Sequence, residues 1–216
     1  MPRAHTFLVL FVGQIFLSVL PLLAQQVVDR IMARIEDDIV TLSEVRELRG
    51  YQQLVEGHAA SDDRLLAQLI EQWIVNTEAA AARYPRPAEA EVNAELERLE
   101  KQVGGPEAYH KRLGELSLPA AAVRRLVEQQ MYLARYLDYK FRPAVQVDPA
   151  AIEKYYREEL APAFAAKGQP PLPLEAVQDQ IRELLIQREI SRRAAQWLEE
   201  ARSRLKVEFA KPGNGP

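Results

Sequence analysis

Four pairs of adjacent acidic residues are the first candidates for chemistry in this sequence. They are Asp37 with Asp38, Asp62 with Asp63, Glu158 with Glu159, and Glu199 with Glu200. General acid–base catalysis needs two carboxylates that are held across a cleft in different environments, so that one keeps a proton and the other does not. Each pair here consists of neighbours at an expected turn, helix start or helix surface. We therefore interpret all four pairs as solvated faces.

Residues for metal binding or nucleophilic catalysis are sparse. The three histidines, His5, His58 and His110, lie far apart, and none has a second ligand at metal-binding spacing. There is no cysteine, which excludes disulfides, thiol catalysis and zinc–thiolate sites. No serine has the flanking glycines of a nucleophile elbow, and no glycine-rich phosphate loop is present. The sequence thus predicts a protein that is not an enzyme and has no catalytic residues, cofactor or metal site.

A group of aromatic residues on either side of a proline-containing bend is the better candidate for a functional surface. Two interpretations are open: the residues pack between helices, or they form a partly exposed surface that binds extended client polypeptides. Tyrosine suits such a surface because it offers a large contact area at a small entropic cost, and methionine adds adaptability. Unfolded outer-membrane strands, rich in alternating aromatic residues, would be suitable clients. The candidate client-binding residues are Met131, Tyr132, Tyr136, Tyr139, Phe141, Tyr155, Tyr156 and Phe164.

Composition limits the class of protein that carries these residues. The chain has 216 residues, of which 48% are hydrophobic and 27% charged, which suffices for one good core. The formal net charge is −3 and no basic patch stands out, which argues against a nucleic-acid partner.

The first 24 residues have the outline of a secretory signal peptide. Arg3 supplies the positive start, residues 7–20 form the apolar segment, and Pro21 precedes the small residue Ala24 at the expected cleavage edge. The alternative is an uncleaved membrane anchor, although the apolar run is short for a span and contains polar residues. The prediction is a periplasmic protein without stable membrane insertion after cleavage.

The mature chain is expected to begin with a β-hairpin at residues 27–41, within the stretch VVDRIMARIEDDIVTLSEV. Thr41 and Glu44 form a capping box that starts the first helix. A hairpin alone is only marginally stable, and the one other strand candidate is LKVEF, at residues 205–209. We therefore expect Val207 and Phe209 to pair with the strand that holds Ala33 and Ile35, so that the two ends of the chain are joined.

The remainder of the chain has the apolar periodicity of helices. The fold class predicted is mainly α, with one domain at residues 25–210 that a small hairpin-based sheet closes. A helical core at 42–143 is followed by a short helix and a proline-rich connector at 148–173, a long helix at 174–204, and a disordered tail at 211–216. Within the core, helices are expected at about 42–55, 62–83, 88–102, 107–116 and 119–141.

This order of elements resembles the SurA family of periplasmic chaperones and foldases. The matching segments are the hairpin stretch at 27–45, the residues Val147, Asp148, Pro149 and Ile152 to Tyr156, and the stretch IRELLIQREISRRAAQWLEEARSRLKVEF at 181–209. The resemblance covers nearly all of residues 26–209. Two departures are clear: the segment between Glu158 and Leu174 is far too short for the family's parvulin-type prolyl isomerase domain, and Glu36 stands where the family commonly has Asn.

The resemblance implies an ATP-independent chaperone that holds unfolded secreted or outer-membrane proteins. Its clients would bind in a groove between the helical core and residues 148–164. Two alternatives come from other classes of function: a foldase related to peptidyl-prolyl isomerases, and a non-catalytic adaptor or structural subunit with one dedicated partner. The oligomeric state does not follow from the sequence.

Overall fold

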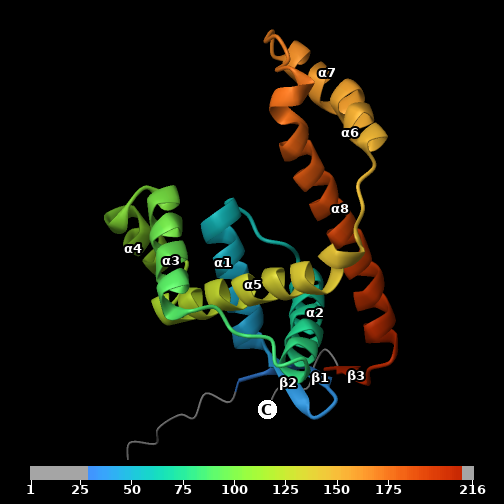
Figure 1. Cartoon of the computed structure of the whole chain (residues 1–216). Helices are drawn as coiled ribbons and strands as arrows, with labels where there is room; N and C mark the ends of the chain where they lie inside the picture. Colours follow the sequence, from blue (N-terminus) through green and yellow to red (C-terminus); the bar gives the residue numbers. More distant parts are fainter. Residues whose placement is uncertain (1–28, 211–216) are drawn as a thin grey trace, which may run out of the picture.

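A computed structural model describes residues 29–210 of the chain. It is mainly helical, with a small antiparallel sheet made by the N-terminal hairpin and a C-terminal strand, which confirms the predicted fold class (Figure 1). The expected signal peptide, Val27 and Val28 of the expected hairpin, and the expected tail at 211–216 lie outside the described residues. The elements are β1 (Ile31–Ile35), β2 (Asp38–Thr41), α1 (Leu42–Glu56), α2 (Asp62–Ala81), α3 (Glu89–Val103), α4 (Pro106–Glu115), α5 (Ala120–Phe141), the 3₁₀ helix η1 (Arg142–Ala144), α6 (Pro149–Tyr155), the π-helix η2 (Tyr156–Leu160), α7 (Ala161–Ala166), α8 (Leu174–Ser203) and β3 (Val207–Phe209).

The sheet joins the two ends of the described chain. Its strand order is β2-β1-β3, so β1 lies in the centre and is antiparallel to both neighbours. Val207 pairs with Ile35 and Phe209 pairs with Ala33, which confirms the predicted pairing of the C-terminal strand with β1. Ala33 and Ile35 are fully buried because their face of the sheet covers the helical core. The C-terminal strand begins at Val207 rather than at residue 205, and Leu205 packs against the core instead.

The turn between β1 and β2 explains why a glutamate is suitable at position 36. Glu36 has a φ of 50°, in the left-handed region, where a residue with a Cβ atom costs about 1–2 kcal/mol. Its carboxylate accepts a hydrogen bond from the Lys206 amide at 2.8 Å, and its own amide donates to the Lys206 carbonyl at 3.1 Å. Glu36 thus extends the pairing of β1 with the C-terminal segment by two hydrogen bonds, which offset the backbone strain.

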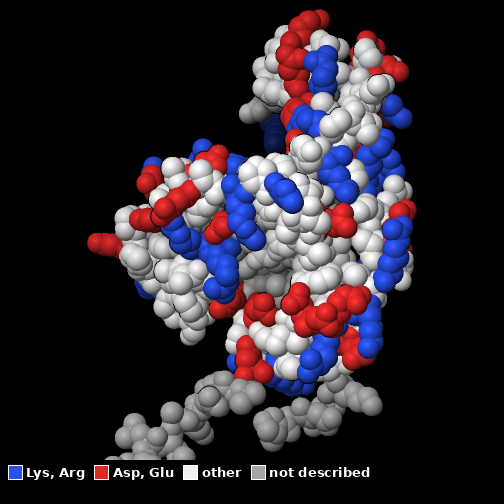
Figure 2. Space-filling view, turned by 60° about the horizontal axis from the view of Figure 1, so that its bottom comes forward, with Lys and Arg blue, Asp and Glu red and all other residues white. Residues whose placement is uncertain are grey.

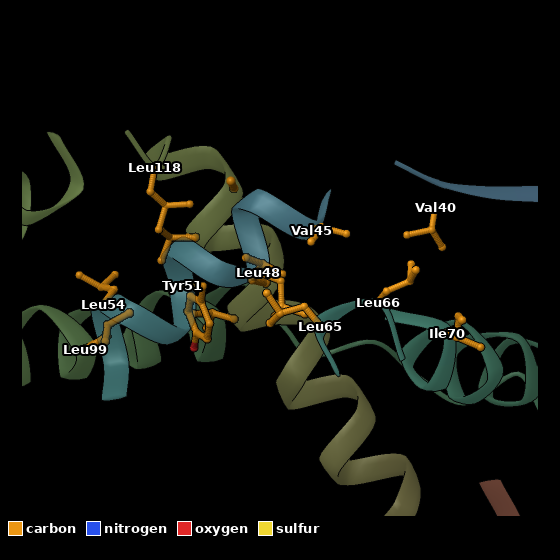
Figure 3. Packing of buried hydrophobic residues seen from close by; sticks show 14 of the residues in the cluster. Val40, Val45, Leu48, Tyr51, Leu54, Leu65, Leu66, Ile70, Leu99 and Leu118 are labelled. Carbon is orange, nitrogen blue, oxygen red and sulfur yellow. The ribbon is translucent and has the colours of Figure 1, made fainter. Parts of the chain in front are cut away.

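Helices α1, α2 and α5 supply most of the core. Leu48 of α1 and Leu65 of α2 lie side by side beneath Val45, and Tyr51 continues the same face of α1 (Figure 3). Leu48, Leu65, Ile70 and Val123 are each no more than 1% exposed. Helix periodicity places these residues on single faces, so burial of one stripe per helix is sufficient to orient all three helices.

Side-chain hydrogen bonds cap the starts of α1 and α6. The Thr41 hydroxyl accepts from the Glu44 amide, and Glu44 accepts from the Thr41 amide at 2.7 Å, which confirms the predicted capping box. Asp148 accepts from the Ala150 amide at 2.9 Å. Ser61 occupies the cap position of α2 without a side-chain hydrogen bond.

Helix α8 extends from the helical core into a projecting arm (Figure 1). With 30 residues it is about 45 Å long. We call residues 149–189 the arm and residues 29–141 with 190–210 the body. In the arm, α6, η2 and α7 fold back along α8, and Ile152 packs with Val177 and Ile181 in a small apolar cluster. The proline-rich connector is shorter than expected, because α7 continues to Ala166.

Removal of residues 205–216 tests the junction between the chain ends. The truncation deletes β3 and the packed side chains of Leu205 and Val207, and it exposes an edge of β1. We expect the free energy of unfolding to fall by about 2–3 kcal/mol, since two partly buried apolar side chains are lost, and solubility to fall with it. Chemical denaturation measures this effect. Removal of residues 211–216 alone is the control and should change neither quantity; a longer truncation that unfolds like the intact chain would contradict the junction.

Candidate functional site

Two of the candidate client-binding residues belong to the core. Tyr132 is 2% and Tyr136 is 3% exposed, so neither can contact a client while the body is folded. They pack with Val75 and Ala79 of α2. Inter-helix packing, one of the two interpretations of these tyrosines, is therefore the correct one for this pair, and the surface interpretation is wrong for it.

Tyr84, in the segment between α2 and α3, packs against both rings and contributes to this burial. Its ring centre lies 5.9 Å from that of Tyr132 and 5.5 Å from that of Tyr136. The Tyr132 hydroxyl donates to the Tyr84 carbonyl at 3.3 Å, and the Tyr84 hydroxyl donates to the Arg135 carbonyl at 3.2 Å. Tyr139 lies at the edge of this cluster and is 62% exposed. The cluster thus attaches the α2–α3 segment to α5, and only Tyr139 of this face remains accessible.

The other candidates fall into separate places. Phe141 and Met131 are partly buried in the body, where the Phe141 ring lies 6.0 Å from that of Trp197. In the arm, Tyr155 lies under the Arg188 guanidinium, and the Tyr156 hydroxyl donates to the Leu172 carbonyl at 2.7 Å. Phe164 is half-buried in α7. The structure therefore does not bring the eight residues together into one surface, and the arm tyrosines stabilise the arm itself.

A groove that sequence reasoning missed lies where α1, α2, α5 and α8 meet. Its volume is about 310 Å³. Four glutamines and five apolar side chains form most of its lining, with two glutamates beside them. The lining residues are Leu48, Gln52, Glu56, Gln68, Glu71, Gln72, Val75, Gln130, Leu133, Leu137 and Leu198.

The groove has an amide end and an apolar end. Along α2, Gln68 and Gln72 precede Val75; along α5, Gln130 precedes Leu133 and Leu137. These spacings of three and four residues place each row on one helix face. The contact of Gln129 with Gln72 and the shared cluster of Val75 with Leu133 show that the two rows run in the same direction. Such a surface offers neutral hydrogen-bonding groups beside an apolar patch.

Hydrogen bonds between side chains hold the amides in place. Gln52 donates to the Gln68 side-chain oxygen at 2.9 Å and accepts from the Ala60 amide at 2.9 Å. Gln129 donates to Gln72 at 3.1 Å, and the Tyr51 hydroxyl donates to Gln130 at 3.1 Å. In the sequence, glutamines at the edge of an apolar stripe look like ordinary solvated residues. The repeated Gln-to-apolar spacing was the available signal, but only the packing of three helices gives it meaning.

A charge network fixes the arm to the body. The Arg142 guanidinium donates to both oxygens of Glu183, at 2.6 and 3.0 Å, and to both oxygens of Asp138, at 2.8 and 2.9 Å. Gln187 donates to the same two carboxylates. Hydrogen bonds from Arg142 lower the pKa of Glu183 to about 2 and also lower the pKa of Asp138. On the arm, Glu159 and Arg188 form a second bidentate pair.

The molecular surface carries both signs of charge. Figure 2 shows acidic and basic side chains interspersed over the body and along the arm. Within residues 29–210, no three carboxylate or imidazole side chains converge in a way that could hold a metal ion. In the same part of the chain, no helix combines the length and apolarity needed to cross a membrane.

Comparison with known proteins does not identify the chain. No protein-family model matches the sequence, and no curated protein matches it.

Substitution of Tyr136 and Tyr139 separates core from surface on one helix. Tyr136→Ala should lower the free energy of unfolding by about 3–5 kcal/mol, because a fully buried ring leaves a cavity. Tyr139→Ala, three residues later, should change it by less than about 0.5 kcal/mol, because that ring is mostly exposed. Urea unfolding measures both. Equal effects of the two changes would contradict the placement of Tyr84 over Tyr136.

Acid titration of stability tests the charge network at the base of the arm. The folded-state pKa of Glu183, about 2, lies below its ordinary value of 4.5. Its contribution to stability is therefore complete above about pH 4.5 and is lost as the pH falls toward 2. Glu183→Gln should lower the melting temperature by about 1–3 °C at pH 7, since the pair is exposed, and the difference from the unsubstituted protein should disappear near pH 2.

The control for this titration is Glu199→Gln on the same helix. Glu199 is exposed and forms no ion pair within residues 29–210. Its substitution should leave the pH dependence of the melting temperature unchanged. A Glu183→Gln protein that keeps the full acid-side loss of stability would show that other carboxylates account for it.

Proposed function

We propose that this protein is an ATP-independent chaperone that holds unfolded secreted or outer-membrane proteins in the periplasm. The observation that carries the proposal is the groove on the body, which combines an apolar patch with hydrogen-bonding amides. The mainly helical fold with joined chain ends agrees with the resemblance of the sequence to the SurA family. The signal-peptide outline of residues 1–24 supports the periplasmic location.

The dimensions of the groove favour a short extended segment as its occupant. A volume of about 310 Å³ lies at the lower end of the range for ligand pockets, so it accommodates a few side chains and not a folded domain. The groove is open and spans parts of four elements, which suits a segment that crosses it. An unfolded chain presents many such segments, whereas a native protein has buried most of them.

Reversible holding follows from the modest area of the contact. Complete burial of one leucine-sized side chain of a client is worth about 1.5–3 kcal/mol. A few such contacts, less the cost of ordering the client, correspond to weak affinities per site. Release then needs no nucleotide, and a client that folds withdraws its apolar segments from the groove.

The aromatic candidates that are not fully buried are additional positions for client contact, and the proposal does not depend on them. Tyr139 is accessible on α5, and Tyr155, Tyr156 and Phe164 remain half-buried on the arm. A role of these four in client binding stays a prediction. Tyr132 and Tyr136 are no longer part of it, because they are buried.

Aggregation of a denatured outer-membrane protein, measured by light scattering without ATP, tests the proposal. The purified chain lacking residues 1–24 should suppress aggregation at a small molar excess. Leu137→Lys should weaken this suppression by a few-fold, because it puts a charge on the apolar patch of the groove, while the flexible lysine stem lets the fold persist.

The matched control is Leu184→Lys, at a 39% exposed position of the arm outside the groove. It should suppress aggregation as well as the unsubstituted protein, and thermal melts should show both variants folded. Absence of suppression by the unsubstituted protein would refute the chaperone function. Equal loss in both variants would refute the assignment of holding to the groove.

A further inference from the structure

We infer that the groove binds the main chain of an extended client through glutamine amides, so that recognition depends on the peptide backbone more than on side-chain sequence. This inference rests on the proposed function and specifies how the same site selects its clients. It assigns the binding contacts to Gln68, Gln72 and Gln130, and gives Gln52 and Tyr51 the role of positioning them.

The chemistry of the lining favours a neutral polar partner. A glutamine side chain carries a primary amide with two N–H donors and one acceptor oxygen, and the peptide main chain repeats a secondary amide with one donor and one acceptor. The four amides of the groove are uncharged, and the two glutamates, Glu56 and Glu71, are the only charged residues of the lining. Because both of these charges are negative, the lining disfavours an anionic ligand. The main chain of a polypeptide satisfies the amides without adding charge.

The existing hydrogen bonds leave the donors available. The side-chain oxygens of Gln68, Gln72 and Gln130 already accept from Gln52, Gln129 and Tyr51. In the residues that the structure describes, no partner is found for the side-chain NH₂ groups of these three glutamines. Each acceptor is thus occupied from within the protein, and each donor is free to reach a client carbonyl. Gln52 differs, since both its nitrogen and its oxygen are engaged.

The apolar end completes the match to an extended segment. In an extended chain, side chains on one face recur every second residue, about 6.6–6.8 Å apart. A client whose carbonyls meet the glutamines can place successive side chains of that face over Leu133, Leu137 and Leu198. Three leucines form this patch, so apolar residues of different shape are suitable there. Binding therefore requires an extended backbone and a few apolar residues, not a defined sequence.

Backbone recognition is tested with three fluorescent peptides of about ten residues that alternate leucine or valine with serine. The first is the normal peptide, the second exchanges the positions of leucine and valine but keeps their alternation with serine, and the third has alternate amides replaced by esters. An ester carbonyl is a weaker acceptor than an amide carbonyl, while the side chains are unchanged. Fluorescence anisotropy with the unsubstituted protein should give dissociation constants within about two-fold for the first two peptides. The ester peptide should bind about five-fold or more weakly.

Variants then assign the effect to the three glutamines. In a protein with Gln68→Leu, Gln72→Leu and Gln130→Leu, the affinity difference between the amide and ester peptides should disappear. The matched control, Gln53→Leu, changes a glutamine of α1 outside the groove and should keep the difference. The ester comparison with the unsubstituted protein decides the question even if the triple variant does not fold.

The outcomes for the inference and for the chaperone function are distinct. Equal affinity of the amide and ester peptides overturns backbone recognition, and so does strong preference for one peptide order, even when the same preparation still suppresses aggregation. Failure of all peptides to bind, with aggregation still suppressed, removes the groove as the site. Failure of both assays refutes the proposed function itself.

Discussion

The pairing of β1 with β3 is the constraint on which the rest of the structure depends. β1 begins the described chain and β3 ends it, so their three residue pairs close a loop of nearly the whole protein. The closure also determines the course of α8, because β3 begins four residues after this helix ends. Trp197, Leu198 and Ala201 are thereby held against the body, and the first half of the same helix has to project beyond it (Figure 1). One short strand thus positions both the C-terminal half of α8, which covers the core, and the arm.

The groove is a product of the same closure. Leu198 of α8 completes a lining whose other members come from α1, α2 and α5. The charge network at Arg142 contacts α8 closer to the start of this helix than Leu198 does. There it joins the end of α5 to Glu183. An ion pair at an exposed site contributes little to global stability. However, the Arg142 guanidinium binds the carboxylates of both Asp138 and Glu183 through two hydrogen bonds each, which restricts the orientation of α8 relative to α5. The arm direction therefore follows from a rigid helix anchored at its C-terminal half by apolar packing and near its middle by hydrogen bonds.

Local signals in the sequence predicted the fold well, and the site poorly. The hairpin, the Thr41 capping box and the helix ranges depend on neighbouring residues, so pattern alone is informative. The β1–β3 pairing was predictable because a hairpin alone is only marginally stable and residues 205–209 were the one other strand candidate. The assignment of Tyr132 and Tyr136 to a surface site was wrong for the opposite reason. Spacing places Tyr132 and Tyr136 on one face of α5, but the burial of that face depends on Tyr84, which arrives from a different segment. The groove similarly combines glutamines from three helices.

The apolar side chains of the arm pack within the arm itself. Helices α6, η2 and α7 fold against α8, with Ile152 and Val177 nearly fully buried. The π-helix and the Tyr156–Leu172 hydrogen bond complete this local packing. Apolar side chains that pack against one another within the arm are not available to clients at the same time. The arm would have to open before a client could reach these side chains, whereas the groove of the body is already open. The proposed holding function is therefore assigned to the groove and not to the arm.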